Sequence, residues 1–131
     1  MKRAKVDNEE DLAEAMEQLE DRDIDEIEIS GNLKDQVVEI KGKGSVVWGI
    51  VAACFAVAAI ALLTAPSTGG ISGIVAGPAC VPAVAAIGTG GCTMLAKLIC
   101  AAGSVDIMDD LYENTYIAKE TKKKVILRLK D

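Results

Sequence analysis

The chain has 131 residues and a net charge of −6; half of its residues are apolar, only 3% are aromatic and none is histidine. This length suits one compact unit rather than several domains. The acidic balance, with no basic tract that interleaves aromatic residues, argues against nucleic-acid binding.

The first 44 residues are strongly acidic and predict an α/β arm. Asp7 or Asn8 can cap a helix over residues 8–20, with Glu10 placed to complete a capping box after Asp7. Apolar residues then recur at helical spacing on one face of that segment.

A short half-buried strand is predicted next, because Ile27 and Ile29 alternate with glutamates. Gly31-Asn32 predicts a turn. Helical spacing of the apolar residues favours a helix over residues 33–41, while a strand at residues 36–40 is the competing interpretation.

Residues 44–96 then contain no charged side chain, a run of 53 residues. A transmembrane helix needs about 20 mostly apolar residues, so this run can hold two. The first span is predicted from Ser45 to about Ala65. Lys41 and Lys43 flank it and Trp48 lies just inside it, as expected for groups at a membrane interface.

The second apolar stretch runs from about residue 76 to residue 103 and is interrupted by prolines and glycines. Such residues are tolerated in membrane helices where neighbouring groups satisfy the freed backbone, so this stretch is expected to pack against protein. Lys97 either reaches the headgroups from the end of this span or lines a water-filled lumen.

The segment between the spans has two interpretations. Gly69, Gly73 and Gly77 are four residues apart, a spacing that lets a second helix approach closely and predicts an oligomerisation seam. Because prolines bracket the segment, a flexible glycine-rich loop is the alternative for residues 66–78.

Beyond Lys97 the pattern becomes amphipathic and predicts a helix that continues from the second span to about Tyr112. A solvated face is the expected role of its acidic residues, and cation binding is the alternative. Two strands follow, at residues 116–119 and 124–130. The acidic strand at 26–29 and the basic strand at 124–130 are expected to share one sheet.

Several segments resemble a family of small uncharacterised bacterial membrane proteins. These segments are residues 40–49, the turn sequence at residues 64–70, the acidic Glu10-Asp11-Leu12 and the basic residues 122–130. The resemblance implies a bacterial origin and a two-span layout with an acidic N-terminal helix and a basic C-terminal strand. It implies no catalytic residue.

The predicted fold is a membrane α-helical hairpin of two spans, with a small α+β unit formed by both tails. Its parts are an arm at 1–44, the hairpin at 45–103, and a helical extension with a β-hairpin at 104–131. Lysines beside both outer ends of the spans predict that both termini lie in the cytoplasm. With the bacterial origin that the resemblance implies, the expected location is the bacterial inner membrane.

The expected function is an oligomeric integral membrane protein that forms a pore or perturbs the bilayer. The alternatives are a membrane scaffold whose tails recruit an unidentified cytoplasmic protein, or a soluble assembly that buries its apolar hairpins against one another. The expected partners are lipid and further copies of the chain. No enzymatic activity, cofactor or metal is expected, because neither a catalytic set nor a metal-ligand spacing is present.

Overall fold

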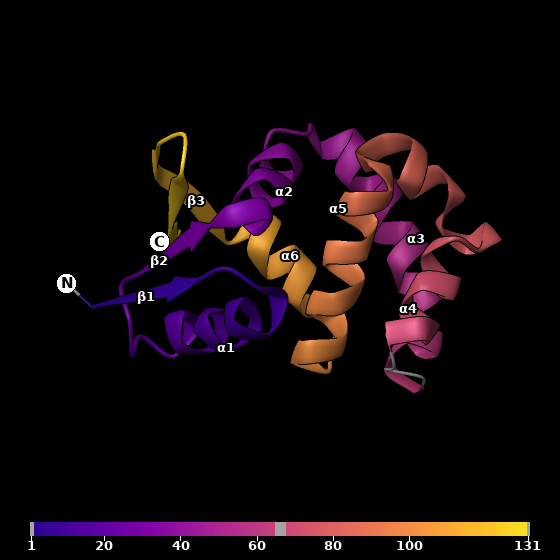
Figure 1. The fold of residues 1–131 in the computed structure, drawn as a ribbon, viewed down its shortest axis with the longest axis horizontal. Helices are drawn as coiled ribbons and strands as arrows, with labels where there is room; N and C mark the ends of the chain where they lie inside the picture. The colour runs from indigo at the N-terminus through magenta and orange to yellow at the C-terminus, as the bar shows by residue number, and fades with distance from the viewer. Residues whose placement is uncertain (1, 65–67, 131) are drawn as a thin grey trace.

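A four-stranded sheet forms one end of the molecule in the computed structural model, which describes residues 2–64 and 68–130 (Figure 1). The strand order is β1-β2-β4-β3. β1 lies parallel to β2, and the other pairs are antiparallel. The strands are β1 (Arg3–Val6), β2 (Glu26–Ser30), β3 (Thr115–Glu120) and β4 (Lys124–Leu129).

The pairing of β2 with β4 confirms that the acidic and basic strands share a sheet. Glu26 lies opposite Arg128, and Ser30 lies opposite Lys124. β1 was not predicted, because its four residues offer no apolar run long enough to indicate a strand. It joins the edge beside β2 and places the N-terminal segment in the same sheet as the C-terminal one.

Two helices cover the inner face of the sheet: α1 (Glu9–Glu20) and α2 (Gly31–Lys41). The helix predicted over residues 8–20 is confirmed, but the capping box from Asp7 to Glu10 is wrong, because Asp7 is not the N-cap. The N-cap is Asn8, whose side-chain oxygen accepts the N–H of Asp11 at 2.9 Å. The helix predicted over residues 33–41 is confirmed as part of α2, so the competing strand at 36–40 is excluded, and the predicted turn at Gly31-Asn32 is wrong. Gly31 has φ +72°, which lets β2 turn directly into α2 without a loop.

The remaining helices stack away from the sheet in layers, with α5 between α1 and α2 on one side and α3 and α4 on the other (Figure 1). They are α3 (Ser45–Thr64), α4 (Thr68–Val75), the 3₁₀ turn η1 (Pro78–Cys80), α5 (Val81–Ala102) and α6 (Asp106–Glu113). α3 and the segment Pro78–Ala102 are long and apolar enough to cross a membrane by length and composition.

These two apolar segments do not form a simple two-helix hairpin. The thiol of Cys100 lies 3.4 Å from the carbonyl oxygen of Leu62, so α3 and α5 end side by side. Near the middle of α5, Gly90 lies against Gln36 of α2, and α2 leads into the start of α3. The second half of α5 therefore runs in the same direction as α3, and α4 and η1 supply the return.

The second half of α5 is a core helix of the α+β unit, as the expectation of protein packing required. Leu95, Leu98 and Ile99 are fully buried, in one hydrophobic core that also includes Leu12 of α1 and Leu127 of β4. The predicted continuous extension to Tyr112 is wrong. α5 ends at Ala102, with Gly103 as its C-cap, and α6 is a separate helix.

A bend divides α5 at Gly88, where φ is 79° and ψ is 166°. Only glycine adopts this region readily, and forcing another residue into it costs about 1–3 kcal/mol. The bend separates the segment that follows η1 from the buried second half of α5. A straight membrane-spanning second helix is therefore not what the structure contains.

We expect Gly88→Ala to lower the free energy of unfolding by about 1–3 kcal/mol because alanine resists this backbone conformation. The matched control is Gly49→Ala, since a Cβ at Gly49 of α3 meets nothing within 4 Å. Denaturant titration of both variants in detergent tests this expectation. Equal stability of the two variants would contradict the bend at Gly88.

Candidate functional site

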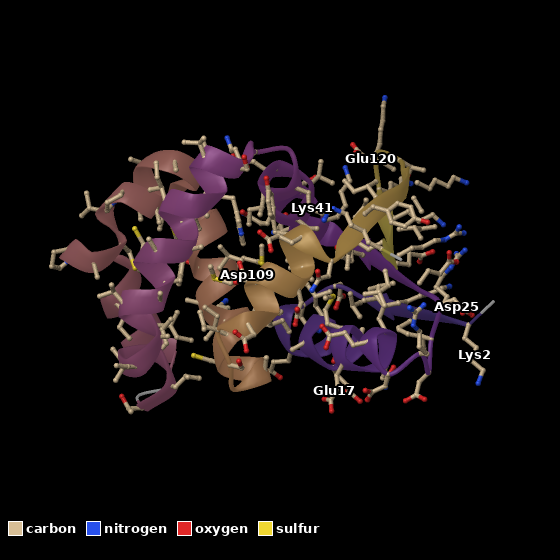
Figure 2. The ribbon with its side chains drawn as sticks, turned by 180° about the vertical axis from the view of Figure 1, so that it is seen from behind. Lys2, Glu17, Asp25, Lys41, Asp109 and Glu120 are labelled. Carbon is tan, nitrogen blue, oxygen red and sulfur yellow. The ribbon has the colours of Figure 1, made fainter. Side chains whose placement is uncertain are left out.

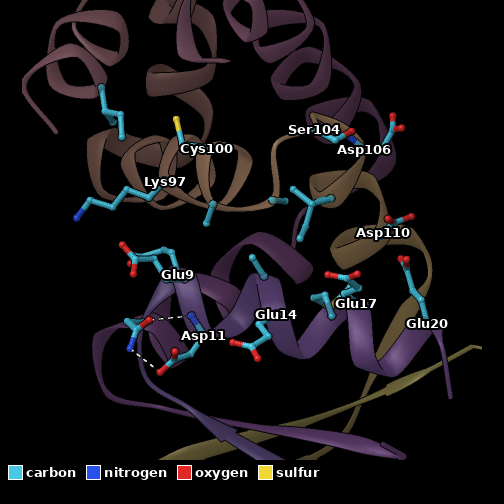
Figure 3. Close-up of a pocket in the computed structure, with 18 residues that line it drawn as sticks. Glu9, Asp11, Glu14, Glu17, Glu20, Lys97, Cys100, Ser104, Asp106 and Asp110 are labelled. Atoms are coloured by element: carbon cyan, nitrogen blue, oxygen red, sulfur yellow. Dashed lines mark hydrogen bonds between the residues drawn. The ribbon is translucent and has the colours of Figure 1, made fainter. Parts of the chain in front are cut away.

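An acidic cleft of about 1080 Å³ lies between α1 and the junction of α5 with α6 (Figure 3). α1 supplies one wall, and the last turns of α5 with the start of α6 supply the other. Its lining includes eight carboxylates: Glu9, Glu10, Asp11, Glu14, Glu17, Glu20, Asp106 and Asp110.

Lys97 is the one basic residue among those that line the cleft. It is half-buried on α5 and lies across from the acidic helix α1 (Figure 3). Lys97 was predicted either to reach the lipid headgroups or to line a water-filled lumen. In the structure its side chain instead faces the acidic wall of a cleft within the protein. The field in the cleft remains strongly negative, which favours cationic groups there.

Two carboxylates meet where α1 ends beside α6: Glu20 and Asp110 point toward one another (Figure 3). The contact with Asp110, burial, and the nearby charges of Asp21 and Glu17 raise the pKa of Glu20 from 4.5 to about 7. Such a pair holds one proton between two groups that repel when both are ionised. Sequence spacing could not reveal it, because 89 positions separate the partners along the chain.

The acidic residues of α6 are divided by the structure rather than gathered. Asp106 and Asp110 line the cleft, Glu113 is exposed, and Asp109 faces α3. Among the described residues, no group of three or more histidines, cysteines, aspartates or glutamates has the geometry to hold a metal ion. The cleft can offer charge to a cationic group, but these carboxylates do not converge on one ion.

Trp48 lies inside the protein rather than on a surface that could meet headgroups. It is 3% exposed, its ring stacks on Tyr112 with centroids 4.3 Å apart, and its indole N–H donates to Asp109 at 3.2 Å. This contact joins the first turn of α3 to α6. The expected role at the membrane interface is thus replaced by an interhelical one.

Lys41 also serves the protein interior (Figure 2). Its ammonium group donates to the carbonyl oxygens of Leu111, Tyr112 and Thr115 at 2.9, 3.1 and 2.7 Å. It therefore satisfies carbonyls at the end of α6. Desolvation, with a smaller effect from Lys130, lowers the pKa of Lys41 to about 8. Lys43 beside it is half-buried, and its backbone carbonyl accepts the hydroxyl of Tyr112.

The three glycines of the predicted seam are not on one helix. Gly69 and Gly73 belong to α4, whereas Gly77 lies beyond its end and precedes η1. Residues 68–75 are therefore helical rather than a loop, and residues 65–67 of the predicted turn lie outside the described residues. Gly73 is exposed, and a Cβ there would meet nothing within 4 Å. Close packing of a second helix at this point stays a prediction.

No protein-family model matches the chain, and neither a curated protein nor a solved structure does. The resemblance to small bacterial membrane proteins therefore stays a prediction.

The Glu20–Asp110 pair predicts a pH-dependent stability. Glu20 binds its proton more tightly in the folded state, so its stabilising contribution is complete below pH 4.5 and is lost as the pH rises toward 7. Asp110→Asn should remove this slope, because an amide can donate to ionised Glu20. Urea unfolding across this window is the measurement, with Glu14→Gln as the control that keeps the slope. A slope that persists in Asp110→Asn would contradict the pairing.

Replacing Lys41 tests its role at the end of α6. Lys41→Met should lower the free energy of unfolding by about 1–3 kcal/mol, because buried carbonyl oxygens lose their donor. The control is Lys43→Met, which keeps the backbone carbonyl that Tyr112 contacts. Thermal unfolding of both variants measures the difference. If Lys43→Met lowers the free energy of unfolding as much as Lys41→Met does, the contacts of Lys41 with the carbonyl oxygens are not the source of the stabilisation.

Proposed function

We propose that the protein is a membrane anchor for a water-exposed α+β unit, with the layer of α3 and α4 in contact with lipid. The observation that carries this proposal is the outer face of α3, which is apolar and uncovered in the described part of the chain. Its large exposed side chains are Val46, Ile50, Val57, Ile60 and Leu63, between 41 and 79% exposed.

The size of this face favours a hydrophobic partner. α3 has 20 residues and extends about 30 Å at a rise of about 1.5 Å per residue. Soluble monomers rarely expose one contiguous apolar patch of this kind. Moving each large side chain from water into lipid gains about 1.5–3 kcal/mol when burial is complete. A few such side chains together suffice for stable attachment.

The layered arrangement favours an anchor over a pore. The second half of α5 is enclosed between the α3–α4 layer and helices that carry the charged residues, so it offers little surface to lipid. The first half of α5 is more open, with Val81 60% exposed, and adds to the apolar end of the molecule. One lipid-facing layer per chain supplies an attachment surface, whereas a pore also needs a polar lining contributed by several copies. Pore formation is therefore the second candidate, with Gly73 on the exposed side of α4 as its available contact.

The arrangement of the tails supports one side of the membrane for both. β1 near the N-terminus and β4 near the C-terminus lie in one sheet, at the end of the molecule opposite α3 (Figure 1). We propose that this side is the cytoplasmic side of the bacterial inner membrane, where the acidic cleft recruits a cationic segment of a partner protein.

Charge on the outer face of α3 should abolish attachment. Val57→Glu combined with Ile60→Glu should release the protein from liposomes in a flotation assay, because both side chains are exposed and the fold does not need them. Ala118→Glu adds charge on exposed β3 and serves as the control. Flotation of the double variant with the liposomes would overturn the anchor. Conductance across the liposomes would favour the pore instead.

A further inference from the structure

The outer face of the sheet is open. α1 and α2 pack on the inner face, where Ile27, Ile29, Val125 and Leu127 are buried. Successive residues of a strand point to opposite faces, so the alternate residues of each strand point outward. No helix of the described residues covers that outer face.

This outer face is cationic where solvent meets it. Glu26 and Glu28 are its acidic residues, and their side chains are only 2 and 12% exposed. They lie beneath Arg3, Lys124 and Arg128, whose side chains are between 37 and 40% exposed and make ion pairs with them at 2.6–3.2 Å. The exposed lysines Lys5 and Lys119 add charge from β1 and β3. Figure 2 shows nitrogen-tipped side chains gathered at this end of the molecule.

The same chain carries a matching acidic surface. Glu10, Glu14, Glu17 and Asp21 follow one another at helical spacing along α1 and its C-cap, on the side away from the core, and the first three also belong to the α1 wall of the acidic cleft. Figure 2 shows Glu17 pointing outward from the lower edge of the molecule. We call these four residues the acidic stripe.

We infer that the outer sheet face of one copy binds the acidic stripe of a second copy. The two surfaces match in length: the 12 residues of α1 extend about 18 Å, and a six-residue strand extends about 20 Å. They cannot meet within one chain, because the sheet itself and the core under α1 lie between them. Contact between two different surfaces is head-to-tail and builds a ring or a chain of copies.

A second copy fits this face better than a polyanion does. Nucleic acid and anionic lipid would meet the same basic residues, but they would also meet Glu26 and Glu28 of this face, and neither offers a row of carboxylates fixed at the length of one helix. A second copy presents its acidic helix while its own basic face points elsewhere. This inference does not depend on membrane anchoring, since it uses neither α3 nor α4.

Two charge-reversal variants test the inference. One changes the basic face with Lys5→Glu and Lys119→Glu; the other changes the acidic stripe with Glu10→Lys and Glu14→Lys. All four side chains are exposed, so both variants should fold. The control is Lys122→Glu with Lys123→Glu, two exposed lysines in the turn between β3 and β4, which changes the net charge as much as the basic-face variant does. The full chain is kept in detergent, so that the α3 face is shielded.

Light scattering with the detergent subtracted gives the mass of each protein at about 0.01 M salt, where charges act over about 30 Å. We expect the wild type and the control to associate, and each reversal variant alone to associate at least about tenfold more weakly. An equimolar mixture of the two variants should recover association, because one intact pair of surfaces remains and the two reversed surfaces also attract each other. About 1 M salt should dissociate the wild type.

Three results would overturn the inference. The first is a mixture that stays monomeric, and the second is wild-type association that salt does not weaken. The third is a basic-face variant that loses binding to anionic vesicles or RNA while both variants keep wild-type self-association. That last result would assign the basic face to a polyanion instead. A failure of the protein to float with liposomes would contradict only the proposed membrane anchor. It would not contradict self-association, because the self-association assay contains no membrane.

Discussion

The burial of the second half of α5 is the constraint on which the rest of the structure depends. Leu95, Leu98 and Ile99 of this segment are fully buried, so the segment packs against protein on two opposite sides. Helices α1 and α2 cover one side and α3 and α4 cover the other. Because one helix serves both layers, the charged unit and the apolar layer form a single core. The molecule consequently has an apolar end, a charged end and an acidic cleft between them.

A second set of contacts holds the corner where α2 leads into α3. Lys41 satisfies carbonyl oxygens at the end of α6, and Trp48 stacks on Tyr112 of the same helix. Lysine and tryptophan beside an apolar run are typical of a membrane interface, but here the side chains of both residues make contacts between helices. The aromatic and cationic groups that flank α3 thus orient the two layers relative to each other. Attachment to lipid has to come from the aliphatic side chains further along α3.

Local patterns predicted much of the secondary structure. The helix at α1, the strands β2, β3 and β4, and the pairing of β2 with β4 followed from apolar periodicity and charge. The failures have local causes: a single glycine conformation let α2 begin without a turn, and β1 was too short to show a pattern. Of the candidate site, the acidic residues of α6 were predicted as a solvated face, and two of them, Asp106 and Asp110, line the cleft. The Glu20–Asp110 contact was not visible, because nothing local joins α1 to α6.

The sequence by itself determined that residues 44–96 carry no charge, that the two tails have opposite character and share a sheet, and that the second apolar stretch needs protein around it. Tertiary structure decided which surfaces remain exposed. α3 is apolar on all sides, so no periodicity distinguishes the face that meets α5 from the face that meets solvent. That choice depends on distant partners: the bend at Gly88, the return through α4 and the docking of α6. Only the folded chain brings these three features together. Local hydropathy shows that α3 is apolar but does not show which of its faces packs against the rest of the protein.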